Sequence, residues 1–543
     1  MGIVGEGSVA AAAIDERMPR RPEIAREALG WAFAVAMAVL VTAHVAITRD
    51  ELVFVDADSM FNALVVHSLT SGAPQDWALS PVLFVPEVAA FALVSAVTPD
   101  LHAVFVVSSM LNFVALYGAF RVASGSRSTA TAPVLGAVAG YAGFCTIALL
   151  ESGGDRDSMQ LASLLGTTTY YGATVIAAVV VIGLVRRVLD AGRLRARLLV
   201  PLGAVAAVSA FSNPLVVVWA VAPIALVLVA QAIVHPERMS RRPRGLLHAP
   251  PAQALLVLAA ASVIGIVARS MLGDLVVARS SEYLKDGNQF VALGDLLRVA
   301  TVELMRPGGV IGGLVLLGLT ALAVVLTFSR TASERPGPGL LVAVAWIAPV
   351  ACTVGVVLLG NPSPRYLQPW VFAPMLVLAC LAEWAPPGIA QRLRGGGAPR
   401  TRRGSATALA AASVVMLVLG GVGAARLATT PTPARAAADS LACVVDWVDA
   451  TDRHGAGQFW TVRAPKAYAA DPATLLQVTH DLHPYEWLVN RTDFDTTAVS
   501  YLVTDSQSAE FVLPEGVSLD DATTVDCGRY TIHDFGSTTI PVG

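Results

Sequence analysis

The chain has 543 residues, of which 55% are hydrophobic and only 14% are charged, with a formal net charge of −3 at pH 7. Its mean hydropathy is +0.63. Soluble globular chains contain about 25% charged residues. This deficit, together with repeated apolar runs of about twenty residues, excludes an ordinary soluble protein and predicts a polytopic α-helical membrane protein. Arginine and alanine are abundant, whereas Lys285 and Lys466 are the only lysines. This bias is typical of GC-rich bacterial genomes, so we expect a bacterial plasma membrane protein.

Apolar runs that are long enough to cross the hydrocarbon core of a bilayer recur along the chain. The basic N-terminus precedes the first of them, so we expect an uncleaved first span rather than a cleaved signal peptide. The predicted spans are 29–48, 101–122, 130–150, 168–187, 196–212, 214–234, 251–271, 307–328, 338–360, 368–385 and 405–427.

A further apolar run, 82–98, decides the predicted topology. If this run lies along the membrane surface, the arginine-rich segments 186–197, 238–244 and 392–403 all fall on the same side as the N-terminus. If the run spans, the segment 186–197 falls on the other side. The positive-inside rule favours the first arrangement. We therefore predict eleven spans, a cytoplasmic N-terminal tail over 1–28 and an extracytoplasmic C-terminus.

The first outer loop, 49–100, contains two amphipathic segments, 57–71 and 86–98. Their spacing predicts helices that lie parallel to the membrane. Asp58 with Ser59 could cap the first helix, and Gly72 could end it. The stretch "DELVFVDADSM" carries four carboxylates: Asp50, Glu51, Asp56 and Asp58. We interpret the first two as interfacial solvation.

The composition changes after the last predicted span. Short apolar and aromatic runs between turn residues predict a small α/β domain over 429–543, with strands at 457–463, 498–504 and 528–535. The topology places this domain in an oxidising compartment, so we predict a disulfide between its two cysteines, Cys443 and Cys527. Three other cysteines lie in apolar runs and are interpreted as core residues: Cys145, Cys352 and Cys380.

Within the predicted membrane domain, 29–428, the layout of about residues 29–385 resembles the GT-C superfamily of membrane glycosyltransferases. The shared features are a first helix, an acidic outer loop with two membrane-parallel helices, and then a multi-helix bundle. The stretch "RYLQPWVFAP" (365–374) is similar to the Arg-Tyr-x-x-Pro entry to a late helix in such enzymes. The resemblance implies transfer of a sugar from a polyprenyl-phosphate donor to an extracytoplasmic glycan or glycolipid in cell-envelope biosynthesis.

The resemblance also implies residue roles. An acidic residue of the first outer loop is the catalytic base, and Asp56 and Asp58 are the candidates. A lipid phosphate is already a good leaving group, so one carboxylate suffices to take the acceptor's proton, while a cation holds the phosphate. Arg365 and Tyr366 are the candidates for donor phosphate binding. Two alternatives stay open: these carboxylates and Glu51 could hold a divalent cation (Mg, Mn or Ca), or the loop could simply be solvated, with Asp58 as a helix cap.

Two other loops contain residues that could line a substrate cleft. In the loop 151–160, Glu151, Asp155 and Asp157 could contact an acceptor or a cation. In the loop 272–306, the candidates are Arg279, Glu282, Tyr283 and Lys285, and ordinary surface charge is the alternative. Three tryptophans of the C-terminal domain could be core residues or sugar platforms: Trp447, Trp460 and Trp487.

The rival interpretation is a membrane protein without catalysis, either an assembly scaffold or a lipid or glycan transporter with a glycan-binding C-terminal domain. Few charges lie inside the predicted spans, which weighs against ion-coupled transport. The chain has no phosphate-binding P-loop motif. Nothing in its charge distribution indicates a nucleic-acid partner.

Overall fold

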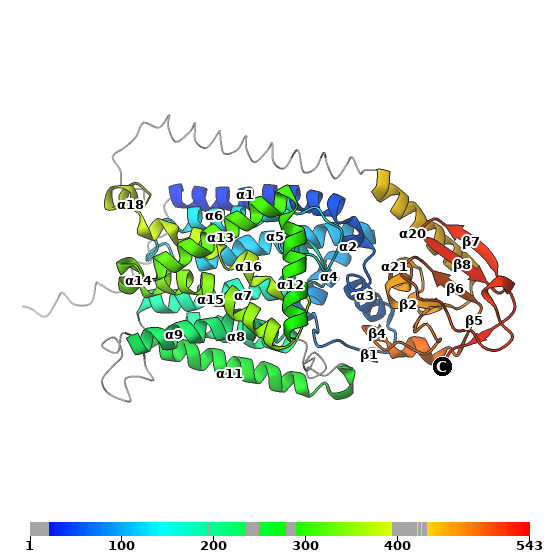
Figure 1. The fold of residues 1–543 in the computed structure, drawn as a ribbon. Coiled ribbons are helices and arrows are strands. Elements are labelled where there is room, and N and C mark those ends of the chain that lie inside the picture. Colours follow the sequence, from blue (N-terminus) through cyan, green and yellow to red (C-terminus); the bar gives the residue numbers. More distant parts are fainter. Residues whose placement is uncertain are drawn as a thin grey trace, which may run out of the picture.

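The computed structural model describes residues 21–192, 195–234, 249–277, 289–393 and 432–543, together with Gly421 and Ala425. A bundle of long, roughly parallel helices forms one part, and a smaller α/β domain is attached to one end of it (Figure 1). Among the described residues, nine helices are long and apolar enough to cross a membrane. The chain is therefore a multi-pass helical membrane protein, as its composition predicts.

Each of these nine helices corresponds to a predicted span. They are α1 (Arg21–Thr48), α5 (Leu101–Ala123), α6 (Pro133–Leu150), α7 (Gly172–Ala191), η2 (Val217–Val221) with α9 (Ala222–Val234), α11 (Pro250–Ser270), α13 (Pro307–Thr327), α15 (Pro336–Leu358), and the run of η6 (Pro364–Leu367), α16 (Pro369–Phe372), α17 (Met375–Cys380) and η7 (Leu381–Trp384).

Two predicted spans are not among these nine helices. The run 196–212 forms α8 (Ala196–Ser212), which packs along α11. With 17 residues and a rise of about 1.5 Å per residue, α8 is about 26 Å long, slightly less than a typical hydrocarbon core. The run 405–427 lies outside the described residues.

The first outer loop leaves and re-enters the bundle at the same end. Phe54, just after α1, stacks on His102 at the start of α5, with ring centroids 3.8 Å apart. Between them, α4 (Val85–Ser95) has 11 residues. Such a helix is about 16 Å long, too short to cross a bilayer. This agrees with the prediction that 82–98 does not span.

The first predicted helix of this loop begins later than expected, whereas α4 begins one residue earlier than the predicted 86–98 and ends three residues sooner. After α2 (Asp50–Phe54), a turn covers residues 56–60, and α3 runs over Phe61–Ser71. Its N-cap residue is Met60, without a side-chain cap, so the predicted capping role of Asp58 is wrong. The turn carries the Asp58 side chain away from the helix start. Gly72 ends α3 in the left-handed conformation (φ 73°), as predicted.

The C-terminal domain is built on a five-stranded sheet with strand order β3-β2-β6-β8-β7. β2 pairs in parallel with β3 and β6, and β8 pairs antiparallel with β6 and β7. The elements are α20 (Thr432–Thr451), β2 (Gly455–Gln458), α21 (Phe459–Tyr468), β3 (Leu475–Val478), β6 (Tyr501–Thr504), β7 (Thr523–Cys527) and β8 (Tyr530–Asp534), with the short β4 (Val489–Asn490), β5 (Ala498–Val499) and β9 (Ile540–Pro541).

Two of the three strands predicted for this domain match β6 and β8. The prediction of a strand over 457–463 is wrong beyond Gln458, where α21 begins, because two parallel strands need a crossover and α21 provides it. Cys443 on α20 and Cys527 on β7 form a disulfide with their Cα atoms 5.5 Å apart, the pairing predicted from the sequence.

The C-terminal domain is docked on the first outer loop. β1 (Trp77–Ala78) of that loop pairs antiparallel with β4. Arg491 Nη1 lies 3.0 Å from Asp76 Oδ1. Arg529 Nη1 lies 2.8 Å from Glu51 Oε1. We call this end of the bundle the domain end, and the end with α14 (Arg330–Glu334) and α18 (Pro387–Leu393) the opposite end (Figure 1).

Candidate functional site at the domain end

The structure brings together two residues that the sequence singles out in distant segments. Arg365 Nη1 lies 3.3 Å from Asp58 Oδ2. The arginine sits in η6, where the chain enters the last described bundle helix, and the aspartate sits in the turn before α3. The Arg365 side chain remains 26% exposed, and its buried Nε has no hydrogen-bond partner among the described residues. Because the side chain is partly exposed and the described residues engage only its Nη1, the guanidinium has donor capacity left for an anion.

Asp56 has a different environment from Asp58. Its Oδ1 accepts hydrogen bonds from the backbone N–H groups of Asp58 and Ser59 and from the Tyr170 hydroxyl at 3.0 Å. Its Oδ2 lies 3.2 Å from Arg156 Nη1. The carboxyl is buried, and this burial together with the charge of Asp58 raises the pKa of Asp56 to about 6. Asp56 thus holds the turn that presents Asp58.

A cavity of about 780 Å³ opens beside Arg365 and Tyr366. Its walls come from four segments: the loop 151–160, which we call the second outer loop, α12 (Gln289–Leu304), the approach to η6 and the C-terminal domain. Neither Asp56 nor Asp58 lines it directly. Its lining includes acidic side chains, among them Asp155 and Asp157, and also Trp487. It further includes three arginines: Arg298, Arg306 and Arg365.

Arg298 and Arg306 are each only loosely paired with a neighbouring carboxylate. Arg298 is 70% exposed and lies 3.7 Å from Asp295. Arg306 lies 3.7 Å from Glu303 and donates to the Ser152 hydroxyl. In both arginine–carboxylate pairs, the distance between nitrogen and oxygen exceeds that of a direct hydrogen bond. Guanidinium groups suit the planar, bidentate recognition of phosphate, so this wall of the cavity can hold a phosphate-bearing group.

The Tyr366 side chain packs against another aromatic ring. Its ring stacks on Tyr171 with centroids 5.8 Å apart, and its backbone oxygen accepts a hydrogen bond from Trp219 Nε1. These contacts fix the chain on which Arg365 is mounted. Gln368 strengthens the same link, because its side-chain amide donates to the backbone oxygen of Tyr170.

The C-terminal domain covers the turn that carries the two aspartates. Arg463 of α21 is fully buried and donates to the backbone oxygen of Ala57 at 3.3 Å. The Arg156 guanidinium lies 3.5 Å from the ring centroid of Trp460. Trp447, by contrast, packs against Tyr501 inside the domain. Of the three tryptophans, Trp447 therefore has a core role, Trp460 contacts Arg156, which pairs with Asp56, and Trp487 lines the cavity.

Glu151 does not line the cavity, contrary to its predicted role. It is buried, and its carboxylate accepts hydrogen bonds from the backbone N–H groups of Ala162 and Ser163. Arg49, also buried, donates to the backbone oxygens of Asp155 and Gln160. Both residues fasten the second outer loop, since a buried charge is retained only where it is paired and hydrogen-bonded.

The three carboxylates considered for a cation do not converge. Glu51 pairs with Arg529, Asp56 with Arg156, and Asp58 with Arg365. Among the residues that the structure describes, no group of three or more His, Cys, Asp or Glu side chains could hold a metal ion. The other predicted cleft residues, Arg279, Glu282, Tyr283 and Lys285, lie outside the described residues.

Several residues of the site were not singled out in the sequence: Arg156, Tyr170, Arg298, Arg306 and Arg463. One signal was available for Arg306, because it directly precedes the proline that starts α13, much as Arg365 adjoins a proline at η6. Arg463 had no such signal, because its contact with Ala57 joins two domains. In comparisons with known proteins, the sequence matches no family model and no curated protein.

Proposed function

We propose that this chain is a membrane glycosyltransferase of GT-C-like architecture. It takes a sugar from a polyprenyl-phosphate donor and transfers it to an extracytoplasmic glycan or glycolipid. The observation that carries the proposal is the Asp58–Arg365 pair at 3.3 Å beside a cavity lined by two further arginines. A base and a phosphate-binding cation are the two groups that this transfer needs.

The proposed step uses Arg365 as an exchangeable partner. In the absence of donor, its guanidinium pairs with Asp58. When the lipid phosphate enters the cavity, Arg365 turns its free donors to the phosphate, because a charge-assisted bidentate contact is strong. Asp58 is then released from part of this pairing and can accept a proton, which makes it better placed than the buried Asp56 to act as the base.

The bond changes balance without a further reactant. The acceptor hydroxyl loses its proton to the Asp58 carboxylate, and its oxygen bonds to the anomeric carbon of the sugar. The bond between that carbon and the phosphate oxygen breaks, and polyprenyl phosphate leaves with the electron pair. Arg365 stabilises the negative charge that grows on the leaving phosphate. The C-terminal domain supplies Trp487 as an apolar wall for a sugar ring.

The proposal also includes an orientation of the protein in the membrane. The arginine-rich end of the bundle is cytoplasmic, and the domain end faces the extracytoplasmic side of a bacterial plasma membrane. The donor's phosphate then lies at the extracytoplasmic surface of the plasma membrane, the level at which a lipid-linked sugar is presented. The four carboxylates after α1 belong to this surface, where three of them are engaged by arginines.

The test is transfer of radiolabelled sugar from polyprenyl-phosphate donors in membranes that contain the full chain. The matched control is the variant Asp58→Asn/Arg365→Ala, brought to the same level in the membrane. We expect labelled product and released polyprenyl phosphate only with the wild type. If wild type and variant transfer equally, or neither transfers from a panel of donors, the proposal fails and the scaffold or transporter interpretation gains.

A further inference from the structure

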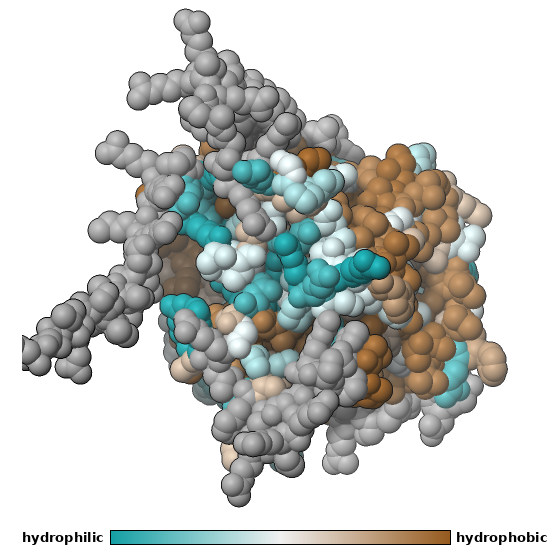
Figure 2. All heavy atoms as spheres, turned by 90° about the vertical axis from the view of Figure 1, so that its left-hand side faces the viewer, coloured by the Kyte–Doolittle hydropathy of each residue, from teal (hydrophilic) through white to brown (hydrophobic). Residues whose placement is uncertain are grey.

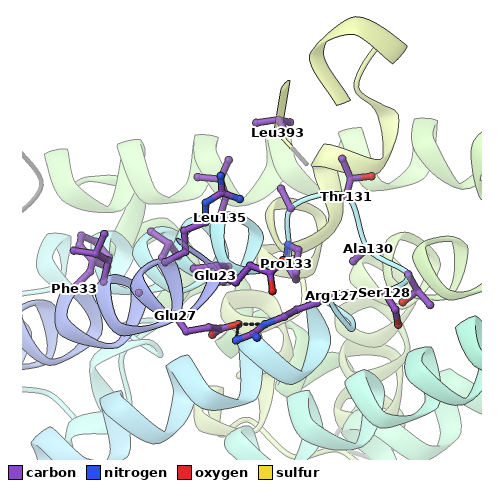
Figure 3. A pocket seen from close by; sticks show the side chains of 17 residues that line it. Glu23, Glu27, Phe33, Arg127, Ser128, Ala130, Thr131, Pro133, Leu135 and Leu393 are labelled. Atoms are coloured by element: carbon purple, nitrogen blue, oxygen red, sulfur yellow. Dashed lines mark hydrogen bonds and ion pairs between the residues drawn. The ribbon is translucent and has the colours of Figure 1, made fainter. Parts of the chain in front are cut away.

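A second large cavity lies at the opposite end of the bundle, far from the aspartates and Arg365. Its volume is about 800 Å³, within the range of about 300–1,000 Å³ that ligand sites occupy. It opens between the start of α1, the segment 127–132, the start of α6 and the end of α18 (Figure 3). We call it the end cavity.

The end cavity has apolar walls and a charged mouth. Its walls are largely aliphatic and aromatic, with Leu29 and Phe33 from α1 and Val134, Leu135 and Val138 from α6. In Figure 3 Glu27 and Arg127 point toward one another at the mouth, where Arg127 Nη2 lies 3.1 Å from Glu27 Oε1. A cavity of this kind suits a molecule with one apolar and one polar part.

The mouth carries more positive than negative charge. Glu27 serves two guanidiniums, because Arg121 Nη2 lies 2.6 Å from the same Oε1 atom. Arg26 is exposed and forms no ion pair with any described residue. The charged lining residues are Arg26, Arg127, Glu23 and Glu27. Because Glu27 also pairs with Arg121 from beside the lining, three guanidiniums share these two carboxylates, so an anionic group is favoured there.

The cavity is also open to the flank of the bundle. Leu135, which lines the cavity, is 54% exposed. Figure 2 shows this end of the molecule face on, with hydrophilic residues near its centre and hydrophobic side chains over one side. A ligand can therefore place its charge at the mouth while its apolar part continues along the outside of α1 and α6.

We propose that the end cavity binds one anionic phospholipid from the leaflet at this end. The phosphodiester contacts Arg26 and Arg127, and the hydroxyls of Ser128 and Thr129 lie on the same rim. The first carbons of an acyl chain fill the space beside Phe33 and Val138. A soluble phosphate would leave these apolar walls uncovered. Basic pockets between membrane helices bind lipid headgroups by the same combination of charge and depth.

The test is native mass spectrometry of the delipidated full-length protein, titrated with phosphatidylglycerol or phosphatidylcholine of identical acyl chains. We expect the wild type to prefer phosphatidylglycerol. Arg127→Gln should weaken phosphatidylglycerol binding about fivefold, and Arg26→Gln/Arg127→Gln about 25-fold, since each arginine near an anionic headgroup contributes comparably. Val138→Phe should reduce binding of both lipids by filling the apolar part. The melting temperature of each variant without lipid shows that it is folded.

The control is Arg330→Gln. Arg330 is exposed at the start of α14, at the same end of the bundle, and does not line the end cavity. This variant should keep the wild-type preference. The proposal is overturned if the wild type binds both lipids equally, if Arg26→Gln/Arg127→Gln keeps its preference, or if Arg330→Gln loses it to the same degree. Full binding by Val138→Phe would also overturn it and would favour occupation of the cavity by the chain segment after Leu393.

Discussion

Arg365 and Asp58 are 307 positions apart in the sequence, yet their side chains form a partly exposed ion pair at 3.3 Å. The pair joins the turn before α3 to the entry of the last described bundle helix. Exposed ion pairs contribute about 0–1 kcal/mol to stability, so stability alone is a weak reason to place them together. A pair beside a cavity, with an unpartnered Nε on the arginine, suits a group that exchanges partners during a reaction.

The first prediction separates the two aspartates. Asp58→Asn should lower sugar transfer by about 10²–10⁴, because an amide cannot take the acceptor's proton. Asp56→Asn should be much milder, since the amide oxygen can still accept from the two backbone N–H groups that hold the turn. The measurement is transfer of radiolabelled sugar at matched protein levels. A lethal Asp56→Asn beside a mild Asp58→Asn would reverse the assignment.

The second prediction concerns the shape of the cation. Arg365→Lys keeps the charge but loses the two-pronged contact with phosphate, so KM for the donor should rise and kcat should fall. Arg365→Ala should be more severe in both constants. The matched control is Arg298→Lys on the same cavity, whose side chain is 70% exposed and should matter less. Equal effects of the two lysine variants would contradict a special role for Arg365.

The third prediction is a pH dependence of stability that comes from Glu87 on α4. This residue is buried, its Oε2 has no hydrogen-bond partner among the described residues, and burial raises its pKa to about 7. The folded state therefore binds more protons than the unfolded state between the unfolded pKa of about 4.3 and pH 7, and stability falls as the pH rises through this window. Such a shift corresponds to at most roughly 4 kcal/mol.

Glu87→Gln tests this directly. The amide keeps an acceptor for the backbone N–H of Ala173, 3.2 Å from Glu87 Oε1, but does not ionise. The melting temperature of the wild type should fall more between pH 5 and pH 8 than that of the variant. The exposed Glu515 supplies the control, Glu515→Gln, which should follow the wild-type curve. Parallel curves for all three proteins would remove Glu87 as the cause.

The fourth prediction concerns the disulfide, which closes a loop with a sequence separation of 84 residues. In the chain-entropy model, a loop of this size corresponds to about 4 kcal/mol of stabilisation. Cys443→Ser/Cys527→Ser should therefore lower the stability of the C-terminal domain and loosen its docking on the first outer loop. Under denaturing, non-reducing conditions the wild type should show three titratable thiols, from the free cysteines Cys145, Cys352 and Cys380, and five titratable thiols would exclude the bridge.

Local patterns were sufficient to predict the helices but not the pairs that build the site. Nine of the predicted spans correspond to helices in the described part of the chain. They could be predicted because the thickness of the bilayer sets the length of each span separately. The capping role predicted for Asp58 was wrong, because capping rules consider only a polar residue that precedes a helix and not the distant Arg365 with which Asp58 pairs. Arg463 and Arg156 escaped prediction for the same reason: their partners, Ala57 and Asp56, belong to other segments.

The last prediction is the orientation of the bundle. The segments after α5 and α7 lie at the end opposite to the C-terminal domain, and they carry many of the arginines that favour a cytoplasmic location. In intact cells, a membrane-impermeant thiol reagent should therefore label Ser506→Cys in the C-terminal domain but neither Ser128→Cys nor Ala196→Cys. All three positions are exposed in the structure, so access to the side chain itself is not limiting. The two unlabelled positions should react once the membrane is permeabilised. Labelling of Ser128→Cys or Ala196→Cys from outside would invert or break the proposed topology, and with it the extracytoplasmic location of Asp58 and Arg365.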